Sequence, residues 1–122
     1  TFLPAISIGL LSVAVLNLNN MRDIENDQQM GKHTIPVKIG LSLAKYYHYL
    51  LIIIAMCLMM LYTVLTLEFR YKALYIIAFV PLVFHLFYVR AVKEPKAFDS
   101  QLKVVALSTF LMSVLFFVGK LI

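Results

Sequence analysis

The chain has 122 residues, of which 62% are hydrophobic and 14% are charged, and its mean hydropathy is +0.90. This composition excludes an ordinary soluble domain and indicates a membrane protein. The formal net charge of +5 does not indicate a nucleic-acid partner, because the Lys and Arg residues are dispersed between apolar runs instead of forming a dense patch.

Four stretches of the chain carry few or no charges: residues 1–21, 46–67, 73–89 and 104–119. A helix needs about 20 residues to cross a bilayer, and Lys or Arg beside the two shorter runs can reach the interface. The sequence therefore predicts an all-α membrane protein, with four transmembrane helices in a single domain over residues 1–122. We expect Pro81 to kink the third helix. The expected helices cover about residues 4–30, 43–65, 73–89 and 103–121.

The first predicted helix begins near Pro4 and ends at Gly31, a residue type suited to a helix C-terminus. At 1.5 Å per residue it extends roughly 40 Å, which is longer than the hydrocarbon core of about 30 Å. Its last two turns are therefore expected to emerge into the interface or into a polar cavity.

Basic residues orient the predicted spans. Four of them lie between the first and second helices and four between the third and fourth, against three on the opposite side. Because cytoplasmic loops carry an excess of Lys and Arg, we expect the first and third connections in the cytoplasm and the chain in the cell membrane. The chain starts with Thr and shows no signal-peptide pattern, so we expect it to be part of a longer protein.

An acidic pair, Asp23 and Asp27, lies near the end of the first predicted helix, in step with Asn19 one turn earlier. Residues four apart share a helix face, so the two carboxylates are expected to face one point. Like charges in this position repel unless a cation lies between them, and Mg²⁺ favours carboxylate oxygens together with phosphates. The alternative is that the pair only solvates a cytoplasmic helix end.

Amides and cations surround the acidic pair. Asn17, Asn19 and Asn20 stand at the end of the apolar run, where polar side chains usually line a protein-facing cavity. Arg22 and Lys32 are donors that suit phosphate oxygens. Beside an apolar bundle, these groups suit a ligand with a phosphate head and an apolar tail.

Residues 19–40 read Asn-Asn-Met-Arg-Asp-Ile-Glu-Asn-Asp-Gln-Gln-Met-Gly-Lys-His-Thr-Ile-Pro-Val-Lys-Ile-Gly. The pattern within them is Asn-Asn-x-Arg-Asp-x-x-x-Asp-x-x-x-Gly-Lys-x-Thr, followed by Val-x-x-Gly. It resembles the second aspartate-rich motif of the UbiA superfamily of intramembrane prenyltransferases. It is most similar to the branch that prenylates 1,4-dihydroxy-2-naphthoate in menaquinone synthesis.

The resemblance implies a nine-helix enzyme of which this chain forms the last four helices. It implies Mg²⁺-dependent transfer from polyprenyl diphosphate to an aromatic acceptor, with Asp23 and Asp27 as catalytic and metal-binding residues. The family's first motif, Asn-x-x-x-Asp-x-x-x-Asp, has no counterpart in the sequence. We therefore expect the chain to be inactive without the N-terminal half of the same enzyme. The candidate substrate-binding residues are Asn19, Asn20, Arg22 and Lys32.

Other functions stay open at this point. Relatives that prenylate 4-hydroxybenzoate or homogentisate, or that modify haem, share the two-motif plan. A small four-helix transporter could couple the acidic pair to a cation, although such carboxylates usually lie near the bilayer midplane. An assembly subunit without a site of its own is a third alternative.

Two histidines fall in or beside predicted spans. We expect His85, which lies between Phe84 and Phe87, to hydrogen-bond a neighbouring helix. His48 follows a pair of tyrosines, a residue type that collects at the membrane interface, so we expect it to be an interfacial anchor. A role for His48 in binding the acceptor is the alternative.

Overall fold

The computed structural model describes residues 2–66 and 72–121, and this part of the chain is helical without strands. Four stretches are long and apolar enough to cross a membrane: Phe2–Arg22, Ile35–Thr66, Leu74–Ala91 and Pro95–Leu121. The predicted all-α membrane fold with four spans is thus confirmed. The elements are α1 (Phe2–Arg22), α2 (Ile24–Gln29), α3 (Ile35–Thr66), the 3₁₀ segment η1 (Lys72–Ala78), α4 (Phe79–Ala91), the 3₁₀ turn η2 (Pro95–Phe98) and α5 (Asp99–Leu121).

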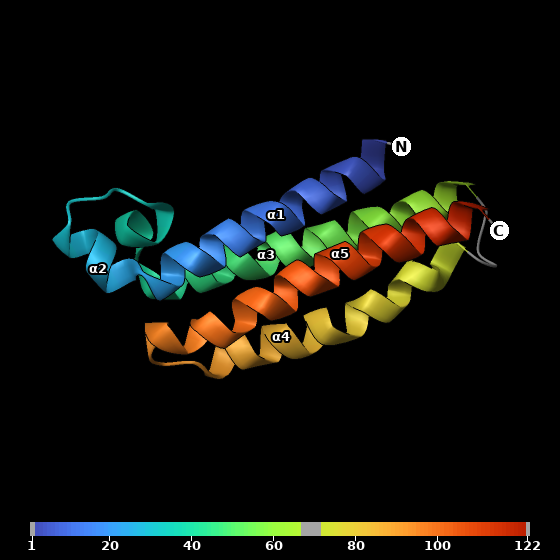
Figure 1. Ribbon diagram of the computed structural model, residues 1–122. Coiled ribbons are helices and arrows are strands. Elements are labelled where there is room, and N and C mark those ends of the chain that lie inside the picture. The colour runs from blue at the N-terminus through green and yellow to red at the C-terminus, as the bar shows by residue number, and fades with distance from the viewer. Residues whose placement is uncertain (1, 67–71, 122) are drawn as a thin grey trace.

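The long helices lie side by side, as Figure 1 shows, with α1 packed on α3 and α5, and α5 packed on α4 and η1. Helix α2, the start of α3 and the connection from α4 to α5 lie at one end of the bundle. The start of α1 and the end of α5 lie at the other end. The two connections that carry most of the basic residues are therefore neighbours. Arg70, which the sequence assigns to the opposite end, lies outside the described residues.

Helices α1 and α3 are antiparallel and are joined by two side-chain hydrogen bonds to backbone carbonyls. The Ser7 hydroxyl donates to the Ala55 carbonyl at 2.6 Å, and the Asn17 amide donates to the Ala44 carbonyl at 3.2 Å. Small residues at the contact let the two backbones approach closely, as is usual for helices in membranes. Apolar side chains of α1 fill the space between these bonds: Leu11 and Ala14 are fully buried.

The first predicted helix, residues 4–30, is divided in the structure. Asp23 has φ −96° and ψ 14°, so α1 ends at Arg22 and α2 begins at Ile24. The chain still turns helically there, because the Asp27 amide donates to the Asp23 carbonyl at 2.8 Å. Gly31, at φ 75°, follows the end of α2 as the sequence predicts, since glycine adopts this left-handed conformation without strain.

The second predicted helix, residues 43–65, agrees with the helix that follows Gly40, but the helical turn before Gly40 was not predicted. Helix α3 begins at Ile35, with Pro36 in its first turn, where the missing N–H of proline costs nothing. Gly40 then interrupts it at φ 85° and ψ 162°, a conformation essentially restricted to glycine. The predicted irregular connection is thus one helical turn followed by a sharp bend.

The last two predicted helices also change at their starts. The 73–89 span is 3₁₀ from Lys72 to Ala78, and Pro81 lies in the first turn of α4 instead of kinking a helix midway. The 103–121 helix begins earlier, at Asp99, where a carboxylate in the first turn is favoured by the helix dipole.

Candidate active site

Arg22 is the centre of a polar cluster at the end of α1. Its Nε donates to Asp23 Oδ1 at 3.0 Å, and its Nη2 donates to Asp23 Oδ2 at 3.2 Å. The same Nη2 donates to Asn19 Oδ1 at 2.7 Å, and Nη1 donates to Asp99 Oδ1 at 2.6 Å. One guanidinium therefore connects α1, the break at Asp23 and the start of α5.

The cluster follows from local geometry. Asn19 precedes Arg22 by nearly one helical turn, so the two side chains are neighbours on α1. The break after Arg22 allows the adjacent carboxylate of Asp23 to meet the guanidinium with both oxygens, which is the bidentate geometry that Arg favours. The hydrogen bond from Arg22 holds the pKa of Asp23 below its usual value. Asp23 is thus a paired carboxylate at neutral pH.

Asp23 lines a polar pocket of about 560 Å³ between α2 and η2, which we term the α2–η2 pocket. The Asp23 side chain retains 36% of its exposure, so it is accessible from the pocket. Carboxylate, amide, ammonium and guanidinium groups all face this space. Its lining residues are Arg22, Asp23, Glu25, Asn26, Gln29, Pro95, Lys96 and Asp99.

Asp27 does not line this pocket. It is buried on α2, which packs against α3, and its side chain is only 8% exposed. Lys32 lies beside it, with Nζ 3.9 Å from Asp27 Oδ1 and with its backbone N–H donating to the Asp27 carbonyl at 2.9 Å. The predicted single point facing both carboxylates is therefore not formed around this pocket, because Asp23 lines it and Asp27 is buried on α2, which packs against α3.

The amides differ in their surroundings. Asn19 accepts from Arg22, whereas Asn20 is half-buried and its side chain makes no hydrogen bond to another described residue. Asn17 is buried and donates to α3, and within the described ranges its Oδ1 atom has no hydrogen-bond partner. Lys32 is 65% exposed. The structure thus places Asn19 and Arg22 in the cluster, and Lys32 next to Asp27.

The donor types fit a magnesium ion that is shared with other ligands. Mg²⁺ usually keeps several waters and is bound through one or two carboxylates plus substrate phosphates. Asp23 can serve this role if a metal takes the place of Arg22 at one of its oxygens. In residues 2–66 and 72–121, however, no cluster of three His, Cys, Asp or Glu side chains is positioned to hold a metal ion. The described residues fit part of a metal site.

Asp99 is the member of the cluster that sequence reasoning missed. It lies 77 positions from Arg22, so no helical spacing relates the two residues. A weak signal existed, because the count of basic residues puts the first and third connections at one end of the bundle. An acidic residue in the third connection was then a candidate partner for Arg22.

The two buried histidines contact each other. His48 Nε2 lies 2.7 Å from His85 Nε2, and His85 Nδ1 lies 2.8 Å from Gln101 Oε1. The prediction that His85 bonds a neighbouring helix is confirmed, since its partners belong to α3 and α5. The prediction that His48 is an interfacial anchor is wrong. His48 is fully buried because it lies on the same face of α3 as Ala44 and Ile52.

Helices that span a membrane and gather carboxylate, amide and guanidinium groups at one end define an intramembrane protein with a polar site at the end of its bundle. The chain belongs to the UbiA prenyltransferase family, whose model matches residues 1–117.

Two curated relatives carry the same name, 1,4-dihydroxy-2-naphthoate octaprenyltransferase. The Haemophilus influenzae protein is 35% identical over 120 residues, which are 98% of this chain and 39% of the relative. The Escherichia coli protein is 34% identical over 117 residues, which are 96% of this chain and 38% of the relative. The chain thus spans less than half the length of these relatives. No solved structure matches it.

Proposed function

We propose that this chain supplies the second aspartate motif of an enzyme that transfers a polyprenyl group from polyprenyl diphosphate to 1,4-dihydroxy-2-naphthoate in menaquinone synthesis. The observation that carries the proposal is the Arg22–Asp23 ion pair on a polar pocket at the end of an apolar bundle, in a member of the UbiA prenyltransferase family. The names of the two relatives support the naphthoate acceptor over other aromatic acceptors. Neither the family nor the position of Asp23 supports a transporter.

The proposed site stabilises the negative charge of the leaving group. Breaking the allylic C–O bond leaves the bonding electrons on pyrophosphate, and cationic donors stabilise that charge as it develops. Arg22 and Lys32 are the proposed donors, and Asn19 and Asn20 the proposed amide contacts. Asp23 and Asp27 are the proposed Mg²⁺ ligands, and the ion supplies further neutralisation of the diphosphate when bound.

The apolar walls have a second role in this proposal. Loss of pyrophosphate leaves an allylic cation, which water captures unless the site excludes it. The electron-rich ring carbon of the acceptor then attacks the cation and completes the transfer. Long apolar helices such as α3 and α5 provide a dry environment for the isoprenoid tail.

The proposal includes a second half of the enzyme. The chain would form the last four helices of a nine-helix bundle, with the other aspartate motif on the N-terminal half of the same protein. The match over less than half of each relative is consistent with this arrangement. We further propose that the α2–η2 end faces the cytoplasm in the cell membrane, because basic residues are concentrated in the connections there.

The test is Mg²⁺-dependent prenyl transfer by the full-length protein in membranes, with Asp23→Asn and Asp27→Asn as the variants. We expect both to lose at least about a hundredfold in rate, as when one charge-stabilising group is removed from an active site. Glu94→Gln is the matched control, because Glu94 is an exposed acidic residue at the same end that does not line the α2–η2 pocket. Full activity in both Asp variants, with normal membrane insertion, would refute the site assignment.

A further inference from the structure

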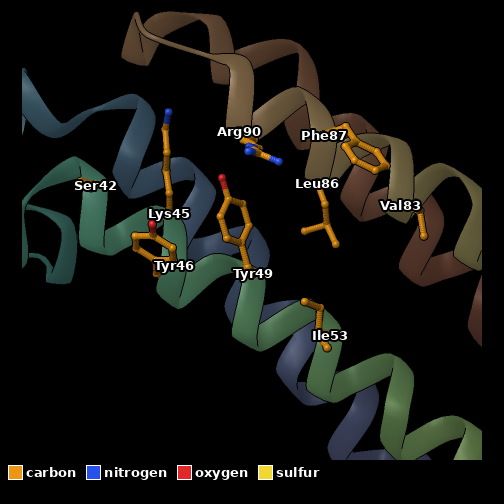
Figure 2. A pocket seen from close by; sticks show the side chains of 9 residues that line it. All are labelled: Ser42, Lys45, Tyr46, Tyr49, Ile53, Val83, Leu86, Phe87 and Arg90. Atoms are coloured by element: carbon orange, nitrogen blue, oxygen red, sulfur yellow. The ribbon is translucent and has the colours of Figure 1, made fainter.

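A second pocket lies between α3 and α4, with a volume of about 620 Å³ (Figure 2). Its residues lie at positions 42, 45, 46, 49 and 53 of α3 and at 83, 86, 87 and 90 of α4, so each wall is a single helix face. We term it the α3–α4 pocket. The lining residues are Ser42, Lys45, Tyr46, Tyr49, Ile53, Val83, Leu86, Phe87 and Arg90.

The pocket is polar at one end and apolar along its length. Lys45, Tyr49 and Arg90 gather at the polar end, and Figure 2 shows the Tyr49 hydroxyl pointing toward Arg90. No acidic residue lines the pocket, and Arg90 forms no ion pair within the described part of the chain. Its two cationic side chains are therefore unbalanced by any lining carboxylate. The apolar part is formed by Ile53, Val83, Leu86 and Phe87.

Both cations lie next to the connection that follows α4. Lys45 Nζ donates to the backbone carbonyl of Val92, which holds its ammonium at the start of the connection after α4. Arg90 lies in the last turn of α4, next to this connection, and is exposed. Tyr46 and Tyr49 stack edge to face, with ring centroids 6.0 Å apart. Tyrosine at this position is typical of the headgroup level of a membrane.

The apolar wall faces outward from the four helices. Phe87 is 64% exposed and Ile53 is 44% exposed, although both lie in membrane-spanning stretches. Behind this wall, His48 of α3 contacts His85 of α4, with their Nε2 atoms 2.7 Å apart. The α3–α4 pocket therefore has a cationic end and a long apolar side.

The α3–α4 pocket is distinct from the proposed prenyl-transfer site. It shares no lining residue with the α2–η2 pocket. An aromatic acceptor must approach the allylic carbon beside the diphosphate, so a pocket without any residue of the diphosphate site does not suit it. A different ligand must combine an anionic group with an apolar chain.

We propose that the α3–α4 pocket binds a phospholipid with an anionic headgroup, with Arg90 and Lys45 contacting its phosphate. Arg is well suited to phosphate, and basic pockets between transmembrane helices bind anionic headgroups. The tyrosine hydroxyls add donors at the same level. One acyl chain lies along Ile53, Val83 and Phe87.

The test is native mass spectrometry of the delipidated full-length protein with palmitoyl-oleoyl-phosphatidylglycerol, and with phosphatidylcholine of the same acyl chains. We expect phosphatidylglycerol to bind more tightly than phosphatidylcholine. Arg90→Gln and Lys45→Gln should each weaken phosphatidylglycerol binding about fivefold, which is the effect of one basic residue near an anionic lipid. Arg90→Lys should retain most of the affinity, because it keeps the charge.

Lys93→Gln is the control, because Lys93 is an exposed basic residue near Arg90 that does not line the pocket. Equal affinity for the two lipids, or an equal loss in Lys93→Gln and Arg90→Gln, would overturn the proposal. So would competition by 1,4-dihydroxy-2-naphthoate for the bound lipid, which would make the pocket an acceptor site. Binding is measured without a prenyl donor, so its outcome is independent of prenyl transfer.

Discussion

The Arg22 guanidinium and the Asp99 carboxylate form an ion pair with Nη1 and Oδ1 2.6 Å apart, although 77 positions separate the two residues in the chain. This contact joins the end of α1 to the start of α5 at the edge of the α2–η2 pocket. Asp23 and Asp99 both bind the same guanidinium. Under the proposed function, Asp99 therefore competes with the substrate diphosphate for Arg22.

The first prediction is that removal of the Asp99 carboxylate changes the affinity for the substrate. We expect Asp99→Asn to lower the KM for polyprenyl diphosphate about two- to fivefold. In the wild type the diphosphate must displace the charged hydrogen bond between Asp99 and Arg22, whereas in the variant this bond is already absent from the free enzyme. Because the Asp99 side chain is 70% exposed, the change in the free energy of unfolding should be at most about 1 kcal/mol. Steady-state kinetics and thermal unfolding measure the two effects. Asp99→Glu, which keeps the charge, serves as the control, and a higher KM in Asp99→Asn would contradict the interpretation.

The second prediction concerns the stability of the fold at low pH. The hydrogen bond from Arg22 lowers the pKa of Asp23 in the folded protein. The pair therefore stabilises the fold fully above the ordinary Asp pKa of about 3.9, and this contribution is lost as the pH falls through the lower, folded pKa. The difference in unfolding free energy between wild type and Arg22→Gln should be constant from neutrality to about pH 5 and should shrink below about pH 4. Denaturant titrations across this range measure it. A difference in unfolding free energy that shrinks toward alkaline pH would contradict this prediction.

The third prediction tests the histidine contact. His85→Ala leaves Nε2 of His48 buried without its partner, and we expect a loss of about 1–2 kcal/mol in the free energy of unfolding. His48→Ala should cost a similar amount, and the double variant less than the sum, with a coupling of about 0.5–2 kcal/mol. Unfolding in mixed micelles measures all three. His33→Ala is the control, because His33 is exposed and should change stability by less than about 0.5 kcal/mol.

The fourth prediction concerns the bend in α3. Gly40 has φ 85° and ψ 162°, so an added Cβ is strained even though no atom lies within 4 Å of it. We expect Gly40→Ala to destabilise the protein by about 1–3 kcal/mol. Gly9→Ala is a matched control, because its Cβ also meets nothing within 4 Å but its backbone is helical, where Ala is favoured over Gly by about 0.5–1 kcal/mol. Equal stability changes at the two positions, measured by thermal unfolding, would show that the bend carries no strain.

Hydropathy alone predicted the number and approximate position of the spans, because an apolar stretch of sufficient length has one stable form in a bilayer. Helix ends were less predictable, since they depend on single residues. Gly40 bends a helix that otherwise continues from Ile35, and Asp99 begins a helix four residues before the predicted start. Average hydropathy does not resolve the effect of such single residues on where a helix begins or bends.

The site was predictable within one helix turn and not beyond it. The proximity of Asn19, Arg22 and Asp23 follows from their spacing along the chain. The contact with Asp99 depends on how α1 and α5 pack, which no local pattern encodes. For His48, the adjacent tyrosines suggested an interfacial position, whereas the 3.6-residue period of α3 determines that its ring faces the bundle interior.

The two hydrogen bonds between α1 and α3 fix the register of one helix along the other. They are separated by the distance from Ser7 to Asn17 on α1 and from Ala44 to Ala55 on α3, about 15 and about 16 Å at the rise of an α-helix. Sliding one helix past the other would break both bonds together in a medium without water to replace them. A change in bilayer thickness should therefore tilt the two helices as one rigid pair, and the depth of Asp23 in the membrane is coupled to α3.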